Sequence, residues 1–380
     1  MDHHQYDIAI VGLGCAGSHI VVQMLDHPAF QDKSIIVFDD FNEDSLDKTW
    51  SFWEKGTGNW DHLLSDQWEL GSFKTRRVSI DLQLTPYRYK KLQSREVIAF
   101  AKAKLQQHPN CTFVEAKVER IIETEVATLK TGQGSFAAHL VLDSRVAKEF
   151  FQDEQAITLK QHFLGWYIKT EKEVFDPKRF VMMDYRLQDP GTTSFIYILP
   201  SSTTEALVEF TYFSASTVKE AVYESYLEEY ISTYLKAVNY SITQTEQGII
   251  PMTTYRFDQH HTPLVHKIGT AGGWVKSSTG YSFKLSEKRA GRLINNYLTG
   301  KPLDSGMQKK RFRFYDDIML DVLNVHNGRG HLLFENLYSN NPISRIFAFL
   351  DEESSFWQEL KIMLPLTSAP FIKSFFRKLF

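Results

Sequence analysis

The chain has 380 residues and a formal net charge of −3; 43% of its residues are hydrophobic and 14% are aromatic. This length exceeds what one small core requires and predicts two or three domains. A charge so close to neutrality gives no general attraction to nucleic acid, so none is expected as a partner. The 28 Phe and 17 Tyr residues are many for this length and favour an apolar ligand site or an aromatic membrane contact.

Cys15 and Cys111 are the only cysteines, so the sequence predicts neither a disulfide framework nor a metal site. A reducing compartment such as the cytoplasm is the simplest expectation. The first apolar strand begins after six residues, and no stretch of roughly 18 apolar residues occurs. We therefore expect neither a secretion signal nor a membrane-spanning helix.

Residues 7–17 form an apolar run that ends in three glycines spaced as G-x-G-x-x-G, and an amphipathic segment, residues 18–25, follows at once. This order predicts a strand that turns tightly into a helix. Gly12 permits the turn, Gly14 lets the backbone approach a pyrophosphate, and Gly17 lets helix and strand pack closely. The phosphates then lie at the positive end of the helix.

A second apolar strand, residues 34–38, ends at Asp39. This position is roughly 20 residues beyond the glycines, where an acid that binds the ribose hydroxyls is expected. Asp40 follows directly and competes for that role. Strand, helix, strand and acid together favour a dinucleotide site over an ordinary glycine turn.

An aromatic segment follows at residues 48–53, with Trp50, Phe52 and Trp53. Two interpretations stay open: a loop that lines a ligand site beside the cofactor, or a packed surface excursion. We expect residues 48–92 to form an excursion on the substrate side of the dinucleotide domain.

The chain then returns to the nucleotide sheet. A helix and four strands are predicted, at residues 93–107, 111–115, 118–123, 127–130 and 139–145. The last of these strands ends in an acid, so Asp143 to Arg145 either edge the cofactor cleft or form a plain strand end.

Four apolar strands between residues 164 and 214, separated by turn residues, predict an antiparallel sheet inserted into the nucleotide domain. Such a sheet would form one wall of a substrate pocket. A helix is expected at residues 219–236 and a short crossover at residues 248–252.

A second glycine-rich segment, residues 268–283, precedes a helix at residues 285–298. A glycine loop and a helix starting near Gly280 point backbone N–H groups and a positive dipole at whatever lies above the sheet. We interpret this segment as a loop that holds a flavin ring, and the alternative is a plain glycine-rich turn before a surface helix. The candidate cofactor-binding residues of this segment are Gly272, Gly273, Thr279, Gly280 and Tyr281.

Residues 301–380 are expected to be helical. In the last twenty residues, 361–380, basic residues alternate with bulky apolar ones and no acid occurs. That pattern suits a helix lying in an anionic membrane interface, and the alternative is a terminal helix packed on its own core.

Together these elements predict an α/β protein with an FAD-binding Rossmann-like domain of the glutathione-reductase or hydroxylase type. We expect this domain to comprise residues 1–160 and 246–300. An antiparallel-sheet substrate domain is expected at residues 161–245, and a helical, membrane-facing region at residues 301–380.

Several motifs resemble those of the bacterial lycopene cyclases of the flavoprotein type. They lie at residues 48–53, 208–214, 250–252 and 272–283, and the likeness extends to residues 349–353. No single motif is specific, but together they are, and they cover nearly the whole chain.

The resemblance implies that the protein closes the acyclic ends of lycopene into β-ionone rings, which gives γ-carotene or β-carotene. The reaction is an isomerisation with no net redox change that nonetheless needs reduced FAD, with NAD(P)H as electron source. The resemblance also carries the family's essential glutamate onto Glu209, and two donors of the first proton stay open, Glu209 and a flavin N–H. Burial among apolar neighbours keeps such a carboxyl protonated by raising its pKa, and a carboxylate that faces solvent is the alternative.

Substrate contacts are expected from Trp50, Phe52, Trp53, Phe210 and Tyr212, because aromatic faces stabilise a cation. Lycopene is available only from the bilayer, so we expect peripheral association with the inner face of the cytoplasmic membrane. Two alternatives stay open. One is a redox flavoenzyme of the same fold, such as an aromatic hydroxylase or an isoprenoid double-bond reductase, and the other is a non-catalytic carrier of apolar lipids.

Overall fold

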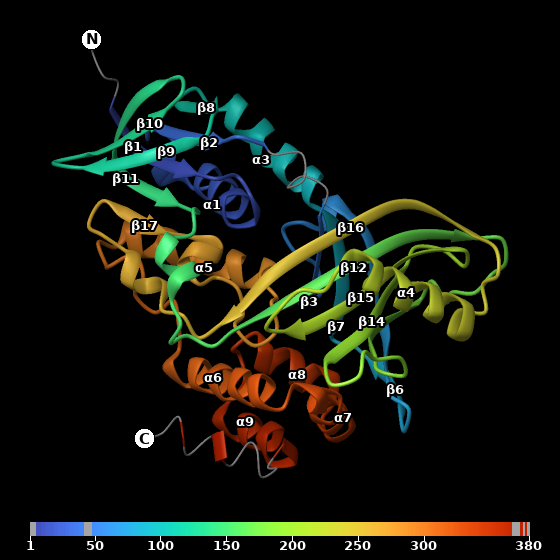
Figure 1. Cartoon of the computed structure of the whole chain (residues 1–380). Helices are drawn as coiled ribbons and strands as arrows, with labels where there is room; N and C mark the ends of the chain where they lie inside the picture. Colours follow the sequence, from blue (N-terminus) through green and yellow to red (C-terminus); the bar gives the residue numbers. More distant parts are fainter. Residues whose placement is uncertain (1–4, 42–47, 367–372, 375–376, 378–380) are drawn as a thin grey trace.

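The computed structural model describes residues 5–41, 48–366, 373–374 and 377. Its first sheet has the strand order β8-β2-β1-β11-β10-β9, with β17 also paired to β11 (Figure 1). The strands of this sheet are β1 (Gln5–Val11), β2 (Ile35–Asp39), β8 (Cys111–Glu115), β9 (Val118–Glu123), β10 (Ala127–Thr131), β11 (Gly134–Asp143) and β17 (Val265–Lys267). All pairs except those of β9 and β10 are parallel, which confirms the predicted nucleotide sheet.

β1 lies at the centre of this sheet because its apolar residues are covered on both faces. Ile8, Ala9 and Ile10 are fully buried, as is usual for parallel strands with cover on each side. One face packs against the helices α1 (Cys15–Leu25), α3 (Ser94–Gln107) and α5 (Phe283–Leu298). These are the three helices predicted around the nucleotide sheet.

The second sheet has the strand order β16-β12-β15-β14-β13-β5-β6. It is antiparallel except between β13 and β5. Its strands are β5 (Leu70–Lys74), β6 (Ser79–Gln83), β12 (Thr158–Thr170), β13 (Arg179–Asp184), β14 (Thr193–Pro200), β15 (Glu205–Ser214) and β16 (Tyr240–Thr253). The antiparallel sheet is thus present, but it reaches beyond the expected 161–245 segment at both ends and includes two strands from the 48–92 segment.

The short crossover expected at residues 248–252 is instead the last part of β16. This strand pairs with β12 from Tyr240, opposite Thr170, to Thr253, opposite Thr158. β16 is an edge strand, and residues 241–245 are all exposed. No apolar pattern therefore marks its first half in the sequence.

Three further strands, β3 (Thr49–Lys55), β4 (Leu64–Trp68) and β7 (Tyr87–Gln93), form a small third sheet. They belong to the expected excursion at residues 48–92. The excursion is therefore regular structure rather than a loop.

Helices cover both faces of the second sheet (Figure 1). α4 (Glu220–Tyr230) packs on one face. The other face packs against the C-terminal helices α6 (Lys310–Val325), α7 (Gly330–Asn340) and α8 (Ile343–Leu350), and α9 (Phe356–Met363) follows. Within the described ranges, no helix has the length and apolar character needed to cross a bilayer.

Most of the predicted interfacial tail beyond residue 366 lies outside the described residues. Two residues of the tail that are described lie against α6. Ser374 donates a hydrogen bond to the Ile318 carbonyl oxygen (3.4 Å), and Arg377 pairs with Asp321.

Candidate active site

The glycine turn between β1 and α1 has the shape that a dinucleotide needs. Gly12 has a φ of +95°, and a Cβ on Gly17 would lie 2.0 Å from the Gly12 carbonyl oxygen, so helix and strand touch as predicted. α1 begins after Gly14, and among the described residues it has no side-chain cap and no acid in its first turn. Its first N–H groups are therefore available to a phosphate.

Two acids lie at the ends of the strands beside this turn. Asp39, at the end of β2, accepts a hydrogen bond from the Leu13 N–H (2.6 Å) and so lies beside the glycine turn. Asp143, at the end of β11, pairs with Arg145 (2.9 Å) and Lys267 (2.7 Å). Burial alone would raise the pKa of Asp143, but these cations hold it below its usual range, so this carboxylate is engaged within the protein rather than open to a ligand.

The second glycine loop, residues 268–283, lies at the start of α5. Gly280 has a φ of +74°, and a Cβ there would lie 2.2 Å from Gln161 Oε1 of β12. Thr279 Oγ1 and Gln161 Oε1 are buried without a hydrogen-bond partner among the described residues. Unpartnered buried polar atoms mark a place where a ligand can complete the hydrogen bonding, so this loop fits a dinucleotide cofactor.

Gly272 and Gly273 form the turn that opens the same loop. A Cβ on Gly272 would lie 2.4 Å from the Lys267 carbonyl oxygen, so the chain turns back tightly on β17 here. Tyr281, near the other end of the loop, lines a cavity that also contains Glu209. The predicted cofactor loop and the predicted acid therefore border one space.

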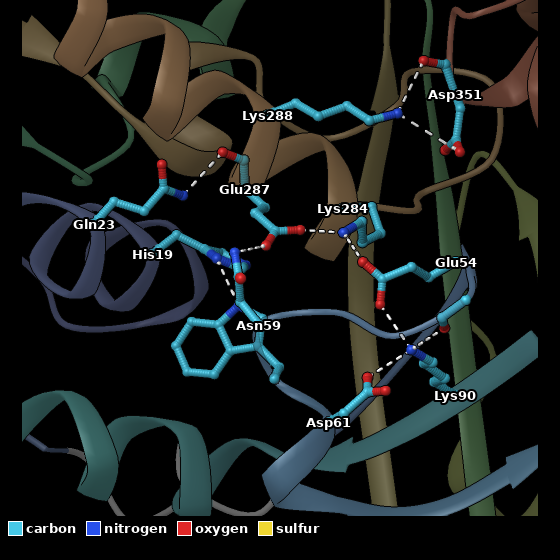
Figure 2. Close-up of polar contacts among 12 residues, drawn as sticks. His19, Gln23, Glu54, Asn59, Asp61, Lys90, Lys284, Glu287, Lys288 and Asp351 are labelled. Atoms are coloured by element: carbon cyan, nitrogen blue, oxygen red, sulfur yellow. Dashed lines mark hydrogen bonds and ion pairs between the residues drawn. The ribbon is translucent and has the colours of Figure 1, made fainter. Parts of the chain in front are cut away.

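A chain of alternating charges fixes the third sheet against the start of α5 (Figure 2). Lys90 of β7 has a fully buried side chain and pairs with Glu54 of β3 (2.8 Å) and with Asp61 (2.5 Å). Lys284 of α5 pairs with Glu54 and with Glu287. A buried charge without such partners would be strongly destabilising, so these contacts hold the 48–92 excursion in one position.

Glu209 of β15 lies in a cavity of about 140 Å³ between the second sheet, the third sheet and residues 279–283. Its side chain is buried, with the residue only 7% exposed. Burial raises the pKa of Glu209 well above its usual value, and the Glu246 carboxylate raises it further, while Lys91 acts in the opposite direction. Its surroundings therefore favour the protonated, neutral carboxyl group, and Glu209 does not face solvent.

Three tyrosines line the same cavity. The Tyr89 hydroxyl lies 2.8 Å from the Tyr197 hydroxyl and 3.2 Å from the Tyr281 hydroxyl. Burial raises the pKa of all three hydroxyls well above the usual value, so they stay neutral. The three tyrosines thus add aromatic rings to the lining of the cavity, and aromatic rings attract a cation.

The aromatic residues predicted in the 48–53 segment separate into two groups. Trp50 lines the cavity that contains Glu209. Phe52 instead stacks on Phe283 with ring centroids 4.6 Å apart, and Trp53 stacks on Phe347 at 4.4 Å. Phe52 and Trp53 are therefore packing residues beside the cavity rather than part of its lining.

Phe210 and Tyr212 lie on the opposite face of the second sheet from Glu209. Phe210 stacks on Tyr226 of α4 with centroids 4.5 Å apart, and both residues belong to the core beneath α4. Successive strand residues alternate between faces, so Thr211 and Phe213 share the Glu209 face and line its cavity. The predicted substrate residues Phe210 and Tyr212 are therefore not part of the cavity lining.

A larger apolar cavity of about 350 Å³ lies between the second sheet and the C-terminal helices. Each of these helices contributes apolar side chains to it, including Ile318, Met319, Leu333, Leu337, Ile346 and Met363. Met183 and Thr279 line both cavities. The two cavities are therefore neighbours, separated by these shared residues.

The sequence analysis missed Glu246, which lines the Glu209 cavity and is 5% exposed. Its neighbours on β16 are mostly exposed and polar, so nothing in the sequence distinguishes it from a solvent-facing carboxylate. Gly165 is the available signal, because a glycine inside an apolar strand often marks a close approach of another group.

Solved structures with a similar fold include flavin-dependent enzymes. The chain is similar to the flavin-dependent brominase Bmp2 (TM-score 0.63, 12% identity, 98% of this chain and 100% of that chain covered). It is also similar to a geranylgeranyl bacteriochlorophyll reductase-like protein from Thermoplasma acidophilum (0.62, 11%, 98% and 99%) and to a flavoprotein/dehydrogenase from Cytophaga hutchinsonii (0.62, 13%, 97% and 99%). The chain therefore has the fold of this class of flavin-dependent enzymes, which confirms the predicted fold class.

A comparison with curated protein sequences gives no match. The family described as "Lycopene cyclase protein" matches residues 7–375, nearly the whole chain. This protein belongs to the lycopene cyclase family.

Proposed function

We propose that this protein is a lycopene β-cyclase, an isomerase that converts the acyclic ends of lycopene into β-ionone rings. The observation that carries the proposal is Glu209, a buried acid in an aromatic cavity that lies beside a larger apolar one. Membership of the family supports lycopene, or another acyclic carotenoid, as the substrate.

In the proposed reaction, Glu209 donates its proton to the terminal double bond of the polyene. The neighbouring double bond attacks the resulting cation, and the new ring then loses a proton. Trp50 and the three tyrosines of the cavity stabilise the cation through their π faces. The buried cavity also keeps out water, which would otherwise capture the cation.

FAD is the proposed cofactor, held by the glycine turn (Gly12, Gly14 and Gly17), by Asp39 and by the loop at residues 272–281. Reduced FAD, when bound, supplies negative charge beside the cation, and NAD(P)H is the proposed reductant. The N-cap residue of α5, Ser282, makes no side-chain cap hydrogen bond among the described residues. The first N–H groups of α5 are therefore open toward the cavity, and the positive end of this helix favours negative charge there.

The C-terminal helices are proposed to receive the substrate from the membrane. α9 exposes Phe356 (56%) and Trp357 (73%), whereas Ile362 and Met363 of the same helix line the apolar cavity. Exposed aromatic residues suit contact with a bilayer interface. We propose that this region lies on the inner face of the cytoplasmic membrane and that the polyene occupies the 350 Å³ cavity.

The purified protein with FAD, NAD(P)H and lycopene in lipid vesicles tests the function. A cyclase forms rings of unchanged mass and consumes far less than one NAD(P)H per ring, because reductant only keeps the flavin reduced. Consumption equal to product, with a mass change of two hydrogens or one oxygen, would identify a redox flavoenzyme and contradict the proposal.

The variant Glu209→Gln tests the assigned acid. It should retain FAD, because β15 is not part of the glycine turn, and it should lose about 100-fold or more in rate, as expected for a general acid. Glu205→Gln is the matched control on the same strand, since Glu205 lies near the surface and pairs with Lys169. Appreciable cyclisation by folded Glu209→Gln protein would remove Glu209 from its role.

A further inference from the structure

A second buried carboxylate, Glu246, lies in the same row of the second sheet as Glu209. Gly165 of β12 pairs with Glu209 of β15 on one side and with Glu246 of β16 on the other. Directly opposed residues of antiparallel strands project to the same face. Both carboxylates therefore stand on one face, on either side of a residue without a side chain, and both line the 140 Å³ cavity.

The glycine leaves a gap that the Glu209 side chain fills. A Cβ built on Gly165 would lie 2.7 Å from Glu209 Cγ and 3.6 Å from Glu209 Cδ. The side chain of Glu209 thus leans over the central strand, in the direction of β16. This orientation brings its carboxyl group toward that of Glu246.

The two carboxyl groups have unequal surroundings. Glu246 accepts hydrogen bonds from the Thr49 N–H (2.8 Å), the Thr49 hydroxyl (2.6 Å) and the Tyr167 hydroxyl (3.3 Å). Glu209 has no hydrogen-bond partner within the described parts of the chain. Donors stabilise an ionised carboxylate, so they favour the charge on Glu246 and leave the proton on Glu209.

The electrostatics of the cavity agree with this division. Burial raises the pKa of Glu246 above its usual value, although the hydrogen bonds from Thr49 and Tyr167 and the charge of Lys91 act in the opposite direction. Glu209 has no such hydrogen bonds from the described residues, and its pKa is raised well above its usual value. Lys91 is itself paired with Asp66 (2.7 Å). The remaining titratable groups around the pair are the tyrosines already described, which stay neutral.

We propose that Glu246 is the catalytic base of this site: it is the ionised carboxylate that takes up the proton released when the new ring forms its double bond. This inference rests on the proposed cyclase function. The Glu209 proton is transferred to the terminal double bond, the ring C–C bond forms, and the ring C–H proton is transferred to Glu246. The proton then passes from Glu246 back to Glu209, so no proton or electron is gained or lost over the cycle.

The test compares Glu246→Gln with Glu205→Gln and the unchanged protein, each with bound reduced FAD and lycopene in vesicles. Glu246→Gln should slow ring formation by about 100-fold or more. Its residual product should contain ε rings or added water, because the cation must lose its charge by another route. Formation of β rings alone at the unchanged rate would overturn the inference while leaving the cyclase function intact; absence of rings with the unchanged protein would overturn both.

A second variant keeps the inference testable if Glu246→Gln does not fold. Thr49→Val removes one hydroxyl donor and keeps the backbone N–H, so the pKa of Glu246 rises. Because Glu246 must be ionised to act, the acidic limb of the pH–rate profile should move to higher pH. If Glu246 has only a structural role, loss of the Thr49 hydroxyl does not shift the pH dependence of the rate. An acidic limb at the same pH as in the unchanged protein would therefore contradict the role of Glu246 as the base.

Discussion

Gly165→Ala is the substitution that tests the geometry of the site most locally. The added methyl would lie 2.7 Å from Glu209 Cγ and 2.9 Å from Leu207 Cδ1. Carbon atoms in contact prefer about 3.5–4.0 Å, so Glu209 must move by roughly 1 Å. Overpacking of this kind costs about 1–3 kcal/mol of stability. A displacement of about 1 Å in a reacting group can lower a rate by about 100-fold.

The assay measures cyclisation rate, bound FAD and thermal unfolding for the same preparation. We expect the rate of Gly165→Ala to fall by one to two orders of magnitude with FAD content unchanged, because the second sheet carries the acid and the first sheet carries the glycine turn. Gly132→Ala is the control, since a Cβ there meets nothing within 4 Å among the described residues. A Gly165→Ala rate equal to that of Gly132→Ala would refute the placement of Glu209 over Gly165.

Three further predictions concern the surroundings of the site. Lys90→Met should lower the free energy of unfolding by about 1–3 kcal/mol in a denaturant titration, because it leaves the partly buried Asp61 without its cation and Glu54 with Lys284 alone. Leu337→Trp should slow cyclisation about tenfold without loss of FAD, because the larger ring fills part of the apolar cavity; an unchanged rate would place the polyene elsewhere. Phe356→Glu combined with Trp357→Glu should weaken binding to anionic vesicles by tenfold or more, since burying one large apolar side chain contributes about 1.5–3 kcal/mol.

Each of these variants has a control in the same chain. Lys55→Met removes an exposed ion pair and should cost less than about 1 kcal/mol. Asn336→Trp places the same ring on the exposed side of α7. Val238→Glu changes an apolar residue that is 90% exposed and lies outside the C-terminal region, so vesicle binding should not change; an equal loss would show that the effect on binding is not specific to α9.

The sequence predicts the nucleotide half of the fold well because its signals are local. The glycine spacing at residues 12–17 requires close approach of helix and strand, and the apolar runs of β1 and β2 are covered on both faces. The structure shows both features, with Gly17 against the Gly12 carbonyl oxygen and Ile8 and Ile10 fully buried. The sequence singles out Asp39 only by its distance from the glycines, and in the structure Asp39 lies beside the glycine turn.

The substrate side is harder to predict because its contacts join distant parts of the chain. Glu246 lines the same cavity as Glu209 because β15 and β16 both pair with β12. The polar, exposed neighbours of Glu246 on this edge strand give no sign in the sequence that it is buried. Phe210 is adjacent to Glu209 in sequence but faces α4, since strand residues alternate between faces. The small third sheet, which brings Trp50 and Thr49 to the cavity, is likewise fixed by a contact between distant residues, the ion pair of Lys284 with Glu54.

Pigment analysis of lycopene-producing bacterial cells that express this protein tests the central claim most directly. Chromatography with mass and absorption detection should show a new pigment of unchanged mass with β-ring absorption, and its one or two rings would show how far the reaction goes. Cells that express Glu209→Gln should retain lycopene. Unaltered lycopene in cells that contain folded, flavin-bound protein, or a product heavier by oxygen or by two hydrogens, would contradict the assignment as a cyclase.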